Sequence, residues 1–302
     1  ESMLLYTLLF MVGWLSMNDL KQFRQLHSQT PGHPEVHIPG VEATTGPLGQ
    51  GVGMGIGMAA GEILYKNICE KKTGIDSSFL FHNTYILCSD GDLQESVSLG
   101  ASSLAGHWKL RNVTMFYDAN DAQISGKTDR ADSTDYGIIF EGFDWHVQLI
   151  DGHNHEEIRD AIQKAQVIEK PSLIIGKTQI AHETATMEGD YETHGMPLPY
   201  KEIDATKEKF GLPQETFYLP NEVCSHFHRR FPKLAEMRTV WDKSLNSAMK
   251  KSAFNQFWNM TVRNKFPELL YPEFESDSHI ATRKAFGLTL DIFATQLPHL
   301  IG

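Results

Sequence analysis

The chain has few of the features that direct a protein to nucleic acid, to a membrane or to an oxidising compartment. Its formal net charge is −11 and it has no run of basic residues, which argues against nucleic acid as a partner. It has only three cysteines, without metal-like spacing, so we expect reduced thiols in a cytoplasmic protein. An apolar stretch at residues 3–15 is too short to span a bilayer and lacks a basic leading region, so it predicts a buried helix and not a signal peptide.

What the chain does contain is typical of a soluble globular protein, with 302 residues, 41% of them hydrophobic and 22% charged. Short apolar runs alternate with helical segments, and this alternation predicts an α/β fold, a doubly wound parallel sheet with helices on both faces. The predicted strands lie at residues 84–88, 112–118, 145–150 and 172–180. The predicted helices lie at residues 3–14, 17–26 (with Ser16 as cap), 94–106, 154–169 and 277–297, and a glycine-rich loop enters a tightly packed helix within 46–65.

Two polar side chains follow consecutive predicted strands. Asp90 comes directly after one apolar run, and Asn120, 29 positions after Gly91, comes after the next. Parallel sheets bind ligands at their carboxyl edge, and Mg²⁺ takes oxygen ligands that it usually shares with a phosphate. The pattern therefore predicts a metal-bridged diphosphate held by Asp90 and Asn120. The alternative is that both residues only cap turns, as Asp and Asn often do.

The spacing of Asp90, Gly91 and Asn120 resembles the thiamine-diphosphate motif, and other segments extend the resemblance to the transketolase family from end to end. These segments are FRQL at 23–26, TPGHPE at 30–35, GVEATTGPLGQG at 40–51, SSLAGH at 102–107, HGMPL at 194–198 and IATRK at 280–284. The resemblance implies a two-carbon ketol transfer from a ketose phosphate to an aldose phosphate, the activity of class EC 2.2.1.1 in the pentose phosphate pathway. The implied cofactors are thiamine diphosphate and Mg²⁺ (or Ca²⁺ or Mn²⁺).

The resemblance also implies a division of the chain. Residues 1–219 correspond to a thiamine-diphosphate- and metal-binding domain that lacks its usual N-terminal segment, residues 220–276 to a helical linker and residues 277–302 to the start of a truncated second domain. The family forms homodimers with the active site between chains. Because the glutamate that activates the cofactor comes from the second domain, outside these positions, we expect the chain to be partial and inactive alone.

Single residues inherit roles from the resemblance. Ala122 is expected to add its backbone carbonyl to the metal ligands Asp90 and Asn120. The resemblance implies that His33 and His194 are catalytic and that His33 and Arg283 bind the sugar phosphate. Cofactor contacts are expected from Gly46, Leu48, Gly91, Glu95, Asn120, Ile124 and Ile180. Asp118 is expected to support the metal loop.

Some of these roles have plain alternatives. Ile124 and Ile180 are expected to sandwich the thiazolium ring, but each could equally be a core isoleucine. Glu95 is expected to couple the two active sites of the dimer, and the alternative is a solvated helix charge. A lone loop histidine such as His33 is more often inert, and here its Gly-His-Pro setting favours function.

Two positions depart from the family pattern. Ser89 replaces the first glycine of the motif, and Tyr191 replaces a histidine that contacts the diphosphate; a phenol donates a hydrogen bond but carries no positive charge. His182 could compensate from a neighbouring position. Three other interpretations stay open. A dihydroxyacetone synthase-like ketol transferase would share almost every motif, and the chain could be the diphosphate-binding subunit of a two-chain enzyme. Ser89 and Tyr191 favour the third, a non-catalytic transketolase-like interaction protein.

Overall fold

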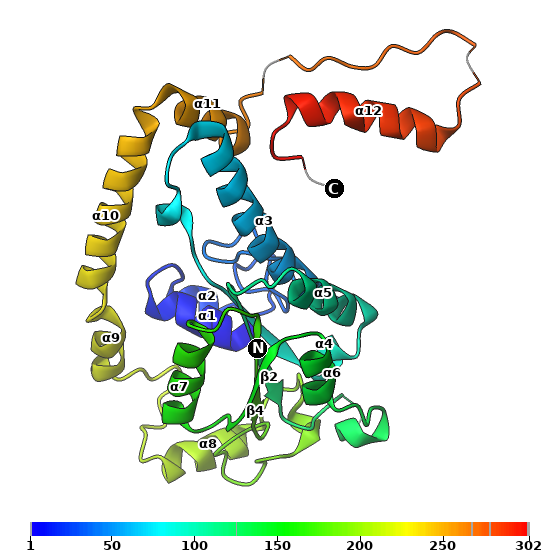
Figure 1. The fold of residues 1–302 in the computed structure, drawn as a ribbon. Helices are drawn as coiled ribbons and strands as arrows, with labels where there is room; N and C mark the ends of the chain where they lie inside the picture. The colour runs from blue at the N-terminus through cyan, green and yellow to red at the C-terminus, as the bar shows by residue number, and fades with distance from the viewer. Residues whose placement is uncertain (1, 125, 267, 278, 301–302) are drawn as a thin grey trace. The chain divides into compact units, whose positions relative to one another are not determined.

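Four parallel strands form the sheet seen in this computed structural model, which describes residues 2–124, 126–266, 268–277 and 279–300 (Figure 1). The sheet consists of β1 (Thr84–Ser89), β2 (Val113–Ala119), β3 (His146–Asp151) and β4 (Ser172–Lys177), in the spatial order β1-β2-β4-β3. All neighbouring pairs are parallel, which confirms the predicted fold class. The central strand β4 is buried along nearly its whole length, as expected for a strand covered on both faces.

The prediction for the end of β4 is wrong. The strand was expected to continue to Ile180, but it ends at Lys177. Its neighbours β2 and β3 end at Ala119 and Asp151, which are the register partners of Lys177. Because both neighbouring strands end level with Lys177, the backbone beyond it leaves the ladder.

Helices cover both faces of the sheet (Figure 1). On one face α3 (Gln50–Thr73) comes so close to Ile86 of β1 that a Cβ at Gly55 would lie 2.7 Å from the Ile86 Cδ1 atom. On the other face α7 (His155–Ala165) lies against β3, where the Gln148 Nε2 atom donates to the Ala161 carbonyl at 3.0 Å. Register places Ile86 and Gln148 on opposite faces.

The first helices differ from the prediction in length and burial. Helix α1 (Ser2–Met11) buries Tyr6 completely but leaves Leu4 54% exposed, so it is buried on one face only. Helix α2 (Met17–Lys21) is shorter than expected, and its predicted cap is confirmed, since Ser16 forms a capping box with Asp19. The apolar surface of these two helices packs with residues of the following loop into a small core of their own.

The other helices lie partly in segments that the sequence predicted to be helical, among them 220–276 and 277–297, and partly in segments for which it predicted no element. The helix predicted over 94–106 is α5 (Ser96–His107). A separate short helix, α4 (Asp90–Leu93), comes before it. The remaining elements are η1 (Ser78–Leu80), η2 (Thr128–Arg130), α6 (Tyr136–Gly142), η3 (Tyr191–Thr193), α8 (Tyr200–Lys209), α9 (Asn221–His228), α10 (Phe231–Met249), α11 (Ser252–Thr261) and α12 (Thr282–Gln296). Among the helices of the described residues, none combines the length and the apolar character that crossing a bilayer demands.

The chain forms two compact units. The first contains residues 1–60 and 82–233, including the sheet, and the second contains residues 61–81 and 234–302. The second unit has its own core around Phe254, which is fully buried. The two units are defined by packing alone. The predicted domain boundaries after residues 219 and 276 stay predictions.

Candidate functional site

The carboxyl ends of β1 and β2 lie side by side, as the sequence predicted. Ser89, the last residue of β1, is the register partner of Asp118. Asp90 follows β1 immediately as the first residue of α4, and Asn120 follows β2 immediately. The structure therefore brings the two predicted metal ligands to one edge of the sheet.

Asp90 has one satisfied and one unsatisfied carboxylate oxygen. The side chain is only 3% exposed, and the Tyr117 hydroxyl donates to its Oδ1 atom at 2.5 Å. The Oδ2 atom is buried and has no hydrogen-bond partner within the described part of the chain. Burial raises the pKa of Asp90, and the Tyr117 hydrogen bond opposes that shift. A buried carboxylate oxygen without a partner costs free energy, and a divalent cation would satisfy it.

Asn120 has its amide orientation fixed by the loop around it. Its Nδ2 atom donates to the Asp118 Oδ2 atom at 3.1 Å, and its Oδ1 atom accepts from the Ala122 backbone N–H at 3.0 Å. The other Asp118 oxygen, Oδ1, accepts from the Thr178 hydroxyl. Asn120 therefore caps its own turn, as the alternative interpretation held, and its carbonyl oxygen keeps a second lone pair for a metal.

The glycine-rich segment lies against the α4 turn. The Asp92 Oδ1 atom accepts from the Gly49 N–H at 3.0 Å, and its Oδ2 atom accepts from both the N–H and the hydroxyl of Ser89 at 3.0 Å. Next to this bridge, a Cβ at Gly91 would lie 3.1 Å from the Leu48 Cδ1 atom. The hydroxyl of Ser89, which replaces the family's glycine, thus has a structural role. Sequence reasoning missed Asp92, although the Ser-x-x-acid spacing at 89–92 was a signal for such a bridge.

Further predicted residues meet along the same segment. A Cβ at Gly46 would lie 3.1 Å from the His33 Cγ atom, and the exposed imidazole of His33 therefore lies beside this glycine. A Cβ at Gly49 would lie 2.6 Å from the Glu95 Cβ atom. Because φ is +76° at Gly49, only glycine takes this position without strain. Glu95 itself is exposed.

The loop after β4 carries the remaining candidates of the first unit. Ile180 is half-buried, and its carbonyl accepts from the Gly189 N–H at 2.8 Å. His194 is exposed and directly follows η3, which begins at Tyr191. His182 is engaged by Glu188, whose Oε1 atom lies 2.6 Å from the His182 Nδ1 atom.

Two other predicted residues, Ile124 and Arg283, are described here by their own surroundings. Ile124 is 80% exposed, so it is not a core isoleucine of this chain. Arg283 belongs to α12 in the second compact unit, and its predicted contact with the sugar phosphate stays a prediction.

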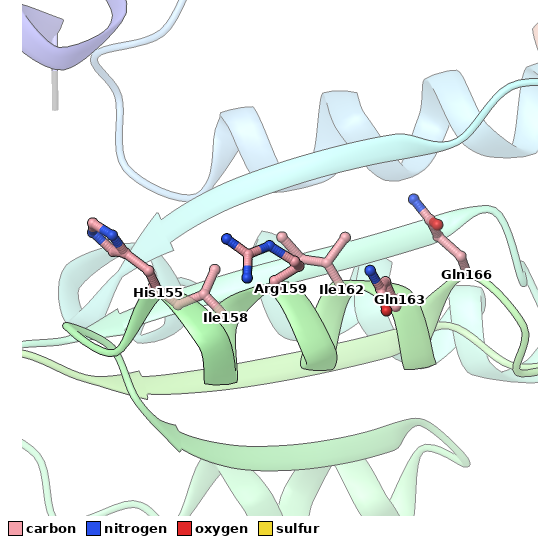
Figure 2. A pocket seen from close by; sticks show the side chains of 6 residues that line it. All are labelled: His155, Ile158, Arg159, Ile162, Gln163 and Gln166. Carbon is pink, nitrogen blue, oxygen red and sulfur yellow. The ribbon is translucent and has the colours of Figure 1, made fainter. Parts of the chain in front are cut away.

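Two further features of the described residues bear on the site: the grouping of metal-binding side chains and a groove along α7. In the ranges that the structure describes, no three His, Cys, Asp or Glu side chains converge as a metal-binding group. A metal at Asp90 would therefore complete its shell with the Asn120 amide, backbone and ligand oxygens. A groove runs along α7, lined by side chains that project from one side of that helix (Figure 2): His155, Ile158, Arg159, Ile162, Gln163 and Gln166. None of the predicted site residues lines it.

Comparison with known proteins places this arrangement in context. The family described as "Transketolase, thiamine diphosphate binding domain" matches residues 1–267. The chain is similar to the transketolase of Halalkalibacterium halodurans, with 39% identity over 311 residues that cover all of this chain and 46% of that protein. It is 37% identical to the transketolase of Bacillus subtilis, again over its whole length and 46% of that protein.

Solved structures show the same likeness. The crystal structure of transketolase from Campylobacter jejuni superposes with a TM-score of 0.85 at 36% identity, covering 98% of this chain and 45% of that one. A transketolase complex with sedoheptulose 7-phosphate from Pichia stipitis gives a TM-score of 0.89 at 32% identity, covering 98% of this chain and 45% of that one. The chain thus spans about half the length of the relatives that it matches.

Proposed function

The chain belongs to the transketolase family, and from this membership we propose that it supplies the thiamine-diphosphate- and metal-binding part of a ketol transferase. The reaction is transfer of a two-carbon ketol unit from a ketose phosphate to an aldose phosphate, within the pentose phosphate pathway. The observation that carries the proposal is the buried Oδ2 atom of Asp90, which has no hydrogen-bond partner among the described residues and lies at the strand edge that also carries Asn120. A carboxylate in this state fits a resident cation better than it fits a structural turn.

The metal and the diphosphate have a defined set of ligands in this proposal. Asp90, the Asn120 amide oxygen and the Ala122 carbonyl hold Mg²⁺, or Ca²⁺ or Mn²⁺ in its place. The Gly91 N–H meets a phosphate oxygen, and its missing side chain leaves room for Leu48 at the same turn. Thiamine diphosphate supplies a nucleophilic carbon and an electron sink when bound.

The protein orients the rings and the sugar. Gly46, Leu48, Ile124 and Ile180 line the cofactor, and the 80% exposure of Ile124 leaves its side chain free for that contact. His33 and Arg283 bind the oxygens of the sugar phosphate; a planar guanidinium suits the phosphate end. His194 and His33 hold or move protons near the reacting carbon, because imidazole can both donate and accept.

A homodimer with the active site between chains is part of the proposal. Glu95 is exposed at the start of α5, where a carboxylate can meet a second copy and couple the two sites. The net charge of −11 favours a protein without nucleic-acid partners. We place the enzyme in the cytoplasm, because an odd count of three cysteines without metal-like spacing suggests reduced thiols.

Calorimetry tests the cofactor site. Thiamine diphosphate is titrated into the longest natural form of the protein, first with Mg²⁺ and then with EDTA. We expect binding that needs the metal and that disappears in Asp90→Ala. The matched control is Asp129→Ala, since Asp129 is an exposed carboxylate in η2.

Either result has a defined meaning. Metal-dependent binding that only Asp90→Ala removes makes ketol transfer the next assay, and acceptor preference then separates a transketolase from a dihydroxyacetone synthase-like enzyme. Absence of binding in the wild type contradicts the proposal and favours a non-catalytic transketolase-like protein, in which Tyr191 and Ser89 mark a decayed site.

A further inference from the structure

The two oxygens of the Asp90 carboxylate differ in their hydrogen bonding. Tyr117, which is 8% exposed on β2, donates its hydroxyl to Oδ1 at 2.5 Å, whereas Oδ2 has no partner among the described residues. Tyr117 is the register partner of Cys88, two residues before Asp90. The contact therefore crosses from β2 to the residue that directly follows the neighbouring strand β1.

Tyr117 is itself held in place. The ring of Tyr136, from α6, packs on it edge to face with centroids 5.9 Å apart and an interplanar angle of 83°. Tyr136 is 6% exposed, and its hydroxyl donates to the Asp132 Oδ2 atom at 2.6 Å. With both rings buried and packed, the direction of the Tyr117 hydroxyl is fixed before any ligand arrives.

We propose that Tyr117 is a positioning residue for the metal: it engages one lone pair of Asp90 Oδ1 and leaves Oδ2 as the oxygen with both lone pairs open to a cation. The inference rests on the proposed function, because it takes Asp90 as a metal ligand. Residues that hydrogen-bond to metal ligands orient them and tune metal affinity. Neither the motif spacing nor the resemblance pointed to Tyr117.

Single-oxygen ligation has a consequence for the choice of metal. Mg²⁺ demands a tight octahedral shell, whereas Ca²⁺ accepts more ligands and readily takes both oxygens of a carboxylate. With Tyr117 in place, Oδ1 has one lone pair engaged in a hydrogen bond, so ligation through Oδ2 alone is favoured over ligation through both oxygens. Tyr117 therefore favours the smaller ion.

The test compares two tyrosines that touch each other. Mg²⁺, and separately Ca²⁺, is titrated calorimetrically into the longest natural form of the protein in the presence of saturating thiamine diphosphate. In Tyr117→Phe we expect Mg²⁺ affinity to fall about 10-fold or more, the size typical of a lost partner to a metal ligand. We expect Ca²⁺ affinity to fall less, so that the Mg²⁺/Ca²⁺ affinity ratio decreases.

Tyr136→Phe is the matched control, since it removes a buried hydroxyl from the ring that packs on Tyr117 without touching Asp90. Thermal unfolding without metal shows whether either variant is merely destabilised. An unchanged affinity ratio in Tyr117→Phe, or equal losses of affinity and stability in the two variants, overturns the inference. If the wild type binds no thiamine diphosphate with either metal, the proposed function fails and the inference falls with it.

Discussion

Asp118 connects two strand ends through one carboxylate. Its Oδ2 atom orients the Asn120 amide, and its Oδ1 atom takes the hydroxyl of Thr178, the first residue after β4. The side chain is half-buried, so water does not freely replace these partners. At the scale of one residue, then, the direction of the Asn120 oxygen depends on Asp118, which is not one of the proposed metal ligands.

Asp118→Asn places an amide donor where the Asn120 amide already donates. We expect a loss of about 1–3 kcal/mol in the free energy of unfolding, the cost of leaving a buried polar group unsatisfied. Chemical denaturation measures it, with Asp129→Asn as the control at an exposed carboxylate. Equal stability of the two variants would show that Asp118 does not hold the loop.

Helix α8 is hydrogen-bonded to the loop that follows β4. Glu202, on its first turn, is 6% exposed and accepts from the Thr186 N–H at 2.7 Å, the Thr186 hydroxyl at 2.6 Å and the Met187 N–H at 3.3 Å. The same loop carries Ile180 and His194, so the Glu202 carboxylate holds a segment that lies between two candidate residues. At the scale of the element, α8 is thus part of the site's scaffold.

The Glu202 contacts predict a pH dependence. Hydrogen bonds from the Thr186 hydroxyl and backbone hold the pKa of Glu202 below its ordinary value of 4.5. A carboxylate with a lowered folded-state pKa stabilises the protein fully above its unfolded pKa, and this stability is lost as the pH falls through the folded value. Glu202→Gln should therefore lower the melting temperature at pH 7, and the difference from wild type should shrink below pH ~4.5.

Differential scanning fluorimetry across the pH range makes this measurement. Glu208→Gln is the control, because Glu208 is exposed on the same helix. A pH-independent difference between Glu202→Gln and wild type would contradict the assigned cause.

The whole molecule has two compact units with separate cores. In the second unit, Phe254 is fully buried and packs with Cys69, Ala248 and Phe257. The sheet of the first unit has its own buried residues, among them Leu173. Units with separate cores open separately in hydrogen exchange.

Phe254→Ala should therefore act on one unit. Removing a buried phenylalanine costs about 3–5 kcal/mol, because a cavity is left in the core. We expect amide protection to fall in residues 234–261 and to persist in the four strands, as read by hydrogen exchange with mass spectrometry. Phe286→Ala, at a ring that is 64% exposed in the same unit, is the control. Equal loss of protection in β2 and β4 would mean that the units unfold together.

Much of the fold and part of the site followed from local sequence. Apolar runs predicted all four strands, and the Ser16 cap could be read from residue type alone. Asp90 and Asn120 could be paired in advance because consecutive strands of a parallel α/β fold often lie side by side, with their carboxyl ends at one edge. These features depend on backbone periodicity and on short separations along the chain.

Contacts between distant residues became apparent only in the folded chain. The strand order, the end of β4 at Lys177, the Gly49–Asp92 bridge and the Tyr117–Asp90 hydrogen bond each join segments that packing brings together. Which polar groups meet depends on which side chains are buried beside one another, and burial is a property of the whole fold. Local pattern therefore predicted the candidate metal ligands, whereas tertiary packing decided which oxygen of Asp90 has no hydrogen-bond partner among the described residues, because the Tyr117 hydroxyl that binds the other oxygen is set in place from a neighbouring strand.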